Sequence, residues 1–488
     1  MDDLPRSPGY TPATPTPVRE PENSGRSQIL TGERCLVCRR ISKWDEKYRF
    51  WFLHENYSFP ETLEHLTRSL GFCFFHGAQA ALDPSGQSSL TFVHNVLARR
   101  VGEMLSRDRS RRLTGKGSIP SLASPDTCRA CVDRDDATGR ALSSLVPVIE
   151  QAESDCRLLV GSLCFPHVQT FISQVSRDLL LRIVPFYETT LSAAVDMVGA
   201  ERENAEDLQP DQDTSRNDSV LLALHLVAGD DGTSGLFPPF LGQYPQSAIR
   251  NPVADFLKDL SADEECPVCK EIRRSWTEWM AWLTDNHSGS DDVCDLLPVC
   301  PAHLRATFHL GNRRIAIRSI RNALDLACSQ VRLGLKLLVP PPVPDRGKPR
   351  FRPGRLFQRE EKPFREVRRV IGRPLPCPVC HRLSTARDRA LILLFALLES
   401  PQHQARFERG NGLCLKHFSR ALTLKPHEGV RAILTEVQIA RLALLQWELE
   451  ESMRKDAWTF RPEAAGTERT AWARAIHRFS GSFPECGE

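Results

Sequence analysis

Residues 377–417 read CPVCHRLSTARDRALILLFALLESPQHQARFERGNGLCLKH. Two cysteines with two residues between them open this stretch, and a cysteine and a histidine with the same spacing close it. The segment from His381 to Ser400 lacks Gly and Pro and is rich in helix-forming residues, so we expect a helix between the two pairs. Two close pairs of Cys or His separated by a longer segment are the usual arrangement of structural zinc ligands.

The same pattern, C-x2-C followed by C-x2-H, occurs four times in the 488 residues, with 30 to 34 residues between the pairs. The first cysteines of successive copies are 93, 138 and 111 residues apart. This uneven spacing is typical of four related modules joined by variable segments, and it argues against a solenoid. The predicted metal ligands are Cys35, Cys38, Cys73 and His76 in copy one, Cys128, Cys131, Cys164 and His167 in copy two, Cys266, Cys269, Cys300 and His303 in copy three, and Cys377, Cys380, Cys414 and His417 in copy four.

These residues predict tetrahedral zinc sites, four in all. A C-x2-C turn supplies one edge of the tetrahedron and a C-x2-H turn supplies the other. Three thiolates and a neutral imidazole around a 2+ ion leave a net charge of about −1. Buried thiols and packing histidines would explain one copy alone, but four copies at matched spacing favour metal binding. We expect basic neighbours to offset the negative charge, namely Arg34, Arg39, Arg129, Lys270 and Lys416.

We expect each metal ion to bind the two pairs of one copy and so to close a helical hairpin. Closing a loop of about 30 residues costs less entropy than closing one of 90 or more, but the difference is only on the order of 1 kcal/mol. Pairs from different copies could also combine, and the sequence leaves this open. We interpret the remaining cysteines as ordinary thiols, with Cys294 a weak candidate for ligand exchange; they are Cys156, Cys294, Cys328 and Cys486.

The segments around the ligand pairs predict helices throughout. Trp276, Trp279 and Trp282 have three-residue spacing, which favours a helical stripe packed in the core. A long amphipathic stretch follows each C-x2-H, and alternating strand patterns with Asn-Gly turns are absent. We therefore expect an all-α protein of tandem helical modules, each closed by a Cys/Cys…Cys/His zinc site.

The composition along the chain predicts eight segments. Pro, Thr and Ser dominate the first 30 residues, and an acidic polar stretch begins the joint between two halves of two modules each. The expected segments are a disordered tail (1–30), zinc module 1 (31–118), zinc module 2 (119–200), a linker (201–255), zinc module 3 (256–339), a basic Pro/Arg-rich linker (340–373), zinc module 4 (374–460) and a C-terminal tail (461–488).

Charge and hydropathy patterns indicate where in the cell the protein is located. The first residues, MDDLPRSPGYTPATPTP, lack the basic and apolar regions of a secretory signal, so we expect a cytoplasmic protein. The longest apolar run, Ala390 to Leu398, is far below the roughly 20 residues that span a membrane. Sixteen cysteines in a reducing compartment favour metal ligands or buried thiols over disulfides. The net charge of +3 indicates neither a nucleic-acid nor a membrane partner.

One local charge cluster leaves a nucleic-acid partner open. The stretch from Arg346 to Arg373 holds eleven Lys or Arg against three Glu, with Phe351, Phe357 and Phe364 interleaved. Basic residues can bind a phosphate backbone and aromatic rings can stack on bases. The alternative is a solvated connector, or one docked on acidic surfaces of its own modules.

The combination of CPVC, a helical segment and then GFC-x2-H or LC-x2-H resembles an uncharacterised family of bacterial helical proteins, known as a domain of unknown function. Members usually carry such pairs twice per chain, so four copies suggest a duplicated two-module unit. Copy one departs from the pattern with CLVC and copy two with CRAC. The resemblance implies metal sites and a helical fold, and it brings no established activity.

The sequence therefore favours a non-enzymatic zinc scaffold or adaptor that mediates contact with a protein partner. Four protein ligands leave no open position on zinc, and no H-E-x-x-H, G-x-S-x-G or Rossmann pattern occurs. Two alternatives remain: an iron–sulfur or redox-sensing protein, because three Cys and a His can hold a cluster, and a nucleic-acid-binding regulator that uses the basic linker. CPVCH at Cys377 to His381 also matches a c-type haem attachment pattern, but the other copies lack the histidine.

Overall fold

The computed structural model is helical, and it contains no strand among the residues it describes. These are residues 35–484 except 114–119, 124, 153–155, 207–217, 231–251, 261–264, 287–295, 310–312, 339–355, 461 and 465. The prediction of an all-α protein is confirmed for this part of the chain. The elements are α2 (Leu36–Trp51), η1 (Phe52–Asn56), α3 (Pro60–Arg68), α4 (Phe74–Ala81), η2 (Pro84–Gly86), α5 (Gln87–Leu113), α6 (Pro120–Ala123), α7 (Arg129–Gln151), α8 (Cys156–Gly161), α9 (Phe165–Phe171), α10 (Arg177–Glu206), α11 (Asp218–Ala228), α12 (Pro252–Asp259), α13 (Pro267–Asn286), α14 (Pro301–His309), α15 (Arg313–Leu338), α16 (Leu356–Ile371), α17 (Pro378–Leu397), α18 (Pro401–Arg409), α19 (Leu415–Thr423), α20 (Glu428–Asp456), η5 (Trp458–Phe460), η6 (Thr467–Thr470) and α21 (Ala471–Ser480).

Each repeat folds into the same succession of helices, which we call units 1 to 4. A helix of 16 to 23 residues begins at the C-x2-C pair, a short helix begins at the C-x2-H pair, and a long helix follows it. The long helices are α5, α10, α15 and α20, with 26 to 30 residues each. The units span residues 35–113, 128–206, 266–338 and 377–456.

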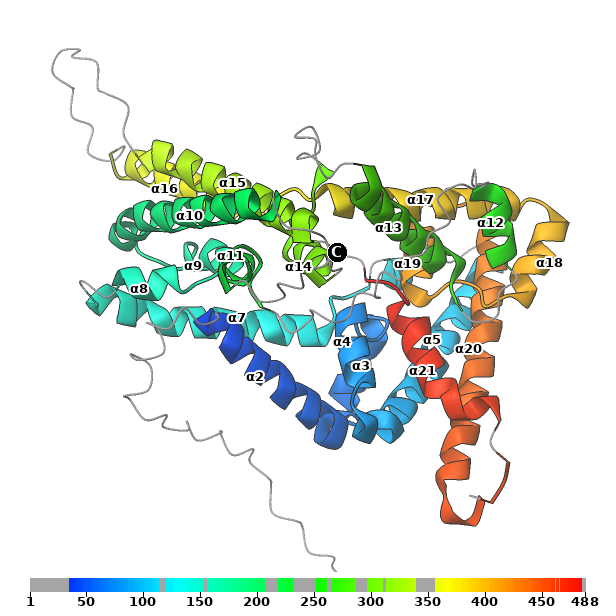
Figure 1. Cartoon of the computed structure of the whole chain (residues 1–488). Coiled ribbons are helices and arrows are strands. Elements are labelled where there is room, and N and C mark those ends of the chain that lie inside the picture. Colours follow the sequence, from blue (N-terminus) through cyan, green and yellow to red (C-terminus); the bar gives the residue numbers. More distant parts are fainter. Residues whose placement is uncertain are drawn as a thin grey trace, which may run out of the picture.

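The four units contact one another in a closed cycle (Figure 1). The C-x2-C helices pack in pairs within each half of the chain, α2 against α7 and α13 against α17. The long helices pack between the halves, α10 against α15 and α5 against α20. The second half therefore repeats the first with α13 in the place of α2 and α15 in the place of α5. This correspondence relates the halves by approximate twofold symmetry.

The repeat extends beyond the four units to two further helices. Helix α11 follows α10 and packs against α9, α10, α14 and α15. Helix α21 follows α20 and packs against α19, α20, α4 and α5, which are the corresponding partners. Each of these helices thus joins its own half to the other half. They lie in the segments 201–255 and 461–488, which composition predicted as a linker and a C-terminal tail.

Two hydrophobic cores hold the units together, and each contains residues from both halves. One core contains Leu97 and Val101 of α5 together with Leu442 of α20. The other contains Val184 of α10 together with Leu324 of α15. Buried positions at three- and four-residue spacing on these long helices explain the pairing, because they form a continuous apolar stripe along each helix. Among the described residues, each of these two cores is therefore shared between the halves.

The predicted Trp stripe packs inside the protein. Trp276 and Trp279 are buried in the core and Trp282 is half-buried, so the packing role of the Trp stripe is confirmed. Each predicted amphipathic stretch after C-x2-H is divided into a short helix and a long one. The predicted disordered tail lies outside the described residues. No helix in the described ranges combines the length and the apolarity that a membrane span requires.

The described part of the basic linker is docked on the protein. Helix α16 packs against α15, and Arg368 donates a hydrogen bond to the carbonyl of Val175 at 2.7 Å. The ring of Phe364 lies under the guanidinium of Arg177, 4.6 Å from its carbon. This aromatic ring is therefore engaged within the protein. Phe351 lies outside the described residues.

Candidate metal centres

All sixteen predicted ligands gather into four clusters of three cysteines and one histidine. In every cluster the ligand atoms lie within 4.8 Å of one another, close enough to hold one metal ion. We name them A (Cys35, Cys38, Cys164, His167), B (Cys73, His76, Cys128, Cys131), C (Cys266, Cys269, Cys414, His417) and D (Cys300, His303, Cys377, Cys380).

The expectation that each ion binds the pairs of one copy is wrong. Every cluster combines the C-x2-C of one unit with the C-x2-H of its neighbour in the same half. In both halves the first and fourth pairs meet, and the second and third pairs meet. We therefore call A and C the outer clusters and B and D the inner clusters. Loop closure favoured pairing within a copy by only about 1 kcal/mol. Burial of apolar surface between paired helices contributes a larger free energy.

Each ligand pair occupies the first turn of a helix. The first cysteine directly precedes the helix and the second ligand is the third helical residue, in all eight pairs. The carbonyl of the first cysteine accepts a hydrogen bond from the amide four residues later, at 2.8 to 3.3 Å. The partial positive charge at a helix N-terminus favours the thiolate form of cysteine. Every cluster therefore lies between the N-termini of two helices.

The distances within the clusters match the edges of a tetrahedron. All three sulfur atoms of each cluster lie 3.1 to 3.8 Å from the histidine Nδ1. The second cysteine of C-x2-C lies 3.6 to 3.9 Å from the cysteine of C-x2-H. Zinc–sulfur and zinc–nitrogen bonds of ordinary length predict sulfur–sulfur edges of about 3.8 Å and sulfur–nitrogen edges of about 3.6 Å. The donor sets are thus suited to a single tetrahedral ion.

The cysteines of cluster A differ in how readily they ionise. Hydrogen bonds with Cys164 and Cys38 hold the pKa of Cys35 far below the usual range of a thiol. A hydrogen bond with Cys164 lowers the pKa of Cys38, but the bond with Cys35 and burial outweigh it and bring the pKa to about 12. Burial, followed by the bonds to Cys35 and Cys38, raises the pKa of Cys164 strongly. A metal ion must displace protons from the last two thiols, so its affinity falls as the pH falls.

One feature of cluster A recurs in the other three clusters. The first cysteine of every C-x2-C pair has a lowered pKa. In cluster B, burial lowers the pKa of His76, but hydrogen bonds with Cys128 and Cys73 and attraction to their charges raise it overall to about 10. These thiols and this imidazole favour a state in which thiolate and imidazolium charges attract one another. A bound metal cation can take the place of the imidazolium proton.

The outer clusters are each covered by a glycine turn. Helix α11 ends at Gly229 (φ +67°), and the next amide, that of Asp230, donates to the sulfur of Cys38 at 3.2 Å. Helix α21 ends at Gly481 (φ +80°), and the amide of Ser482 donates to the sulfur of Cys269 at 3.5 Å. Hydrogen bonds of this kind orient metal ligands and tune their basicity.

This cover was not predicted, although the sequence carries a signal for it. Both turns end an H-x-x-[AS]-G pattern, His225 to Gly229 and His477 to Gly481, and in both the glycine amide bonds the histidine carbonyl. The glycine of the pattern stands 62 residues after His167 in the first half and 64 residues after His417 in the second. A search for repeats that followed only cysteines could not find it.

A buried arginine lies beside each outer cluster. Arg478 donates to the carbonyls of Leu413 and Asn411, at 2.7 and 2.6 Å. Burial lowers the pKa of Arg478 to about 10, against the attraction of the cysteines of cluster C, so it remains charged at neutral pH. Near cluster A, Arg305 donates to the carbonyls of Ala228 and Gly229, at 2.7 and 3.1 Å. These cations can offset the charge of a three-thiolate site.

Three of the basic residues that the sequence suggested for this role have partners outside the clusters. Arg129 pairs with Asp133, and Lys270 pairs with Asp259. Lys416 donates to the carbonyl of Ser69. Arg39 is exposed and Arg34 lies outside the described residues.

The remaining cysteines contribute to no cluster among the described residues. Cys328 is a buried free thiol between α10 and α15, 3.4 Å from the hydroxyl of Ser192. Its interpretation as an ordinary thiol is confirmed. The side chain of Cys156, and all of Cys294 and Cys486, lie outside the described residues.

Chemically, the four clusters offer metal sites that protein ligands alone can saturate. Comparison with protein-family models, curated proteins and solved structures gave no match to this chain. The resemblance to the bacterial family therefore stays a prediction.

Proposed function

We propose that the protein is a non-catalytic scaffold in which four structural zinc ions hold helical units together for contact with a protein partner. The observation that carries this proposal is that each cluster has four protein donors at tetrahedral distances. A zinc ion with four protein ligands has no open position for water or substrate, so it supports structure rather than catalysis. The donors of each cluster come from two units, so each ion would also join them.

The compactness of the clusters supports zinc over an iron–sulfur cluster. In a 4Fe–4S cluster each protein ligand binds a different iron atom, so the ligands spread over the corners of the cluster. Here all ligand atoms lie within 4.8 Å of one another, as they do around one ion. Three sulfurs and one nitrogen are a donor set that structural zinc commonly uses.

An exposed apolar corner of unit 1 supports a protein partner. Phe50 and Leu82 are 59% and 74% exposed, and they stand near the end of α2 and directly after α4. The ring of Phe50 lies 4.5 Å from that of His54, and His54 lies 3.3 Å from the hydroxyl of Ser85, so α2 and the segment after α4 meet here. Large apolar side chains gathered on one surface mark interaction sites in soluble proteins.

A nucleic-acid partner is the weaker alternative. The described part of the basic stretch packs on α15, and both Phe364 and Arg368 are engaged within the protein. Salt-dependent binding to nucleic acid would be its mark.

The proposal is tested by metal analysis of the full chain after anaerobic purification. We expect about four zinc ions per chain by mass spectrometry and no visible absorption band. If the analysis finds iron and a visible charge-transfer band, the protein has an electron-transfer or redox-sensing role instead of a zinc-scaffold role. A chain that folds without bound metal would overturn the proposal.

A further inference from the structure

The four clusters have the same donors, yet they differ in access to solvent. In the outer clusters all the cysteines are buried, while the histidine is buried in cluster C and half-buried in cluster A. In the inner clusters five of the six cysteines are half-buried, and only Cys128 is fully buried. The five half-buried ligands are Cys73, Cys131, Cys300, Cys377 and Cys380.

The cover over the outer clusters explains part of this difference. A Cβ atom added at Gly229 would lie 2.9 Å from the sulfur of Cys164 and 3.2 Å from that of Cys38. The backbone of this turn therefore presses on the sulfurs so closely that not even a methyl group fits between them. At Gly481 the corresponding distances to Cys269 and Cys414 are 3.7 and 3.8 Å, which is ordinary contact. An incoming ligand has no path to either metal position from this side.

Access to cluster D is open on another side. His303 is fully buried, and Trp276 stacks on its ring with the centroids 5.3 Å apart. The three cysteines of the cluster are half-buried on the remaining sides. A cavity of about 550 Å³ between α12, α13 and α17 is lined by His381 and Arg382, the residues that follow Cys380. This cavity therefore borders the helical residues that directly follow Cys380.

We propose that the inner clusters are exchangeable metal sites and that the outer clusters hold their metal permanently. This inference rests on the proposed zinc function. At an inner site the half-buried cysteines would be the ligands that an incoming thiolate, imidazole or carboxylate donor replaces. Each displaced thiolate would take up a proton from water, and the incoming donors would then hold the ion in its place. The chain would thus give zinc to, or accept it from, a partner while its outer sites keep it folded.

The experiment uses the full-length zinc-loaded protein and a chromogenic zinc chelator in excess. We expect two zinc ions per chain to leave in a fast phase and two in a phase at least about 10-fold slower, because outer-shell contacts typically change metal affinity by this order. Helical circular dichroism should persist through the fast phase. Alkylation with N-ethylmaleimide during that phase should label the five half-buried cysteines of the inner clusters and spare Cys38, Cys164, Cys269 and Cys414.

Matched variants assign the phases. Cys131→Ser (cluster B) and Cys380→Ser (cluster D) should each remove one ion from the fast phase. Cys38→Ser (cluster A) changes the same position of an outer C-x2-C pair and should remove one ion from the slow phase. If the outer variant does not fold, the alkylation pattern of the wild-type chain still decides.

Release of all four ions in one phase, or alkylation of the outer cysteines first, would overturn the inference and leave the four-zinc scaffold intact. A chain that contains no zinc at the start would remove both proposals, and the metal analysis shows this before the kinetics begin.

Discussion

At the scale of single residues, Gly229 shows how closely the backbone approaches cluster A. Its φ of +67° belongs to the left-handed region, where glycine is favoured over every other residue. The space at its Cα is also occupied, because Cys164 and Cys38 lie within 3.2 Å of where a Cβ would stand. Gly481 shares the positive φ but has ordinary contact distances. Substitutions at the two glycines therefore distinguish backbone strain, which is present at both, from crowding against the cysteines, which is present only at Gly229.

Gly229→Ala should lower the free energy of unfolding by about 2 kcal/mol or more, the sum of a strained backbone and displaced ligands. It should also accelerate zinc loss from cluster A. Thermal unfolding and chelator kinetics on the full chain would measure both effects. Gly481→Ala should cost less stability and retain zinc, because only the backbone is strained.

A glycine inside a helix serves as the control. Gly102 in α5 has no atom within 4 Å of its Cβ position, so Gly102→Ala should stabilise the chain by about 0.5 to 1 kcal/mol. If Gly229→Ala behaves like Gly102→Ala, the turn does not press on the cluster.

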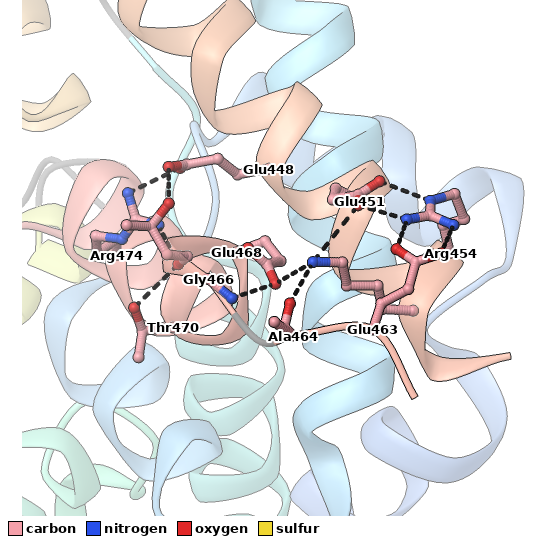
Figure 2. A network of polar contacts seen from close by, with 11 residues as sticks. Glu448, Glu451, Arg454, Glu463, Ala464, Gly466, Glu468, Thr470 and Arg474 are labelled. Atoms are coloured by element: carbon pink, nitrogen blue, oxygen red, sulfur yellow. Dashed lines mark hydrogen bonds and ion pairs between the residues drawn. The ribbon is translucent and has the colours of Figure 1, made fainter. Parts of the chain in front are cut away.

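At the scale of elements, a polar network holds α21 against the end of α20 (Figure 2). Arg474 of α21 pairs with Glu448 of α20 at 2.8 Å, and Lys455 pairs with Glu468 at 3.0 Å. The Gly466 amide also donates to Glu468, and with the Lys455 ammonium it lowers the pKa of this carboxyl to about 2. The network fixes the start of the helix whose other end covers cluster C. The network therefore connects a cluster of ion pairs at the surface to cluster C.

Arg474→Ala should destabilise the chain by about 3 kcal/mol, because it leaves the buried carboxylate of Glu448 without its counter-charge. It should also accelerate zinc loss from cluster C more than from cluster A, since α21 no longer holds Ser482 firmly. Denaturant unfolding and chelator kinetics would measure the two effects.

Arg454→Ala is the matched control. Arg454 bonds Glu451 and Glu463 in the same network, but the Glu463 side chain is 44% exposed, and exposed ion pairs contribute little. Equal losses for the two variants would mean that the network does not act through α21.

At the scale of the whole molecule, the two halves depend on each other for a core. Helices α5 and α10 of the first half pack on α20 and α15 of the second. The approximate symmetry places α15 in the position of α5 and α20 in the position of α10. A second copy of the first half could therefore replace the second half, with its α5 on the α10 of its partner.

A fragment of residues 35–230 should form a dimer instead of a compact monomer. A monomer would expose the apolar stripes of α5 and α10, which include Leu97, Val101 and Val184, at roughly 1.5 to 3 kcal/mol for each fully buried side chain. Sedimentation of the zinc-loaded fragment would measure the mass. A stable monomer with native helicity would show that each half has a sufficient core alone.

The sequence by itself determined the helices and pointed to the sixteen residues that gather into four clusters. A C-x2-C or C-x2-H turn needs only four consecutive residues, and helix formation depends on local composition and periodicity, so both can be recognised in one stretch of chain. The clustering of all sixteen predicted ligands and the helical fold agree with those expectations.

Tertiary structure alone decided which pairs share a cluster, which cysteines are exposed and where the chain returns to cover the outer sites. Pairing within a copy and pairing between copies differ by only about 1 kcal/mol in loop closure, whereas burial of a single large apolar side chain contributes more. The choice therefore depended on the summed packing of α2 on α7, of α13 on α17 and of the long helices across the halves. That sum involves residues hundreds of positions apart, and no local pattern in the chain records it.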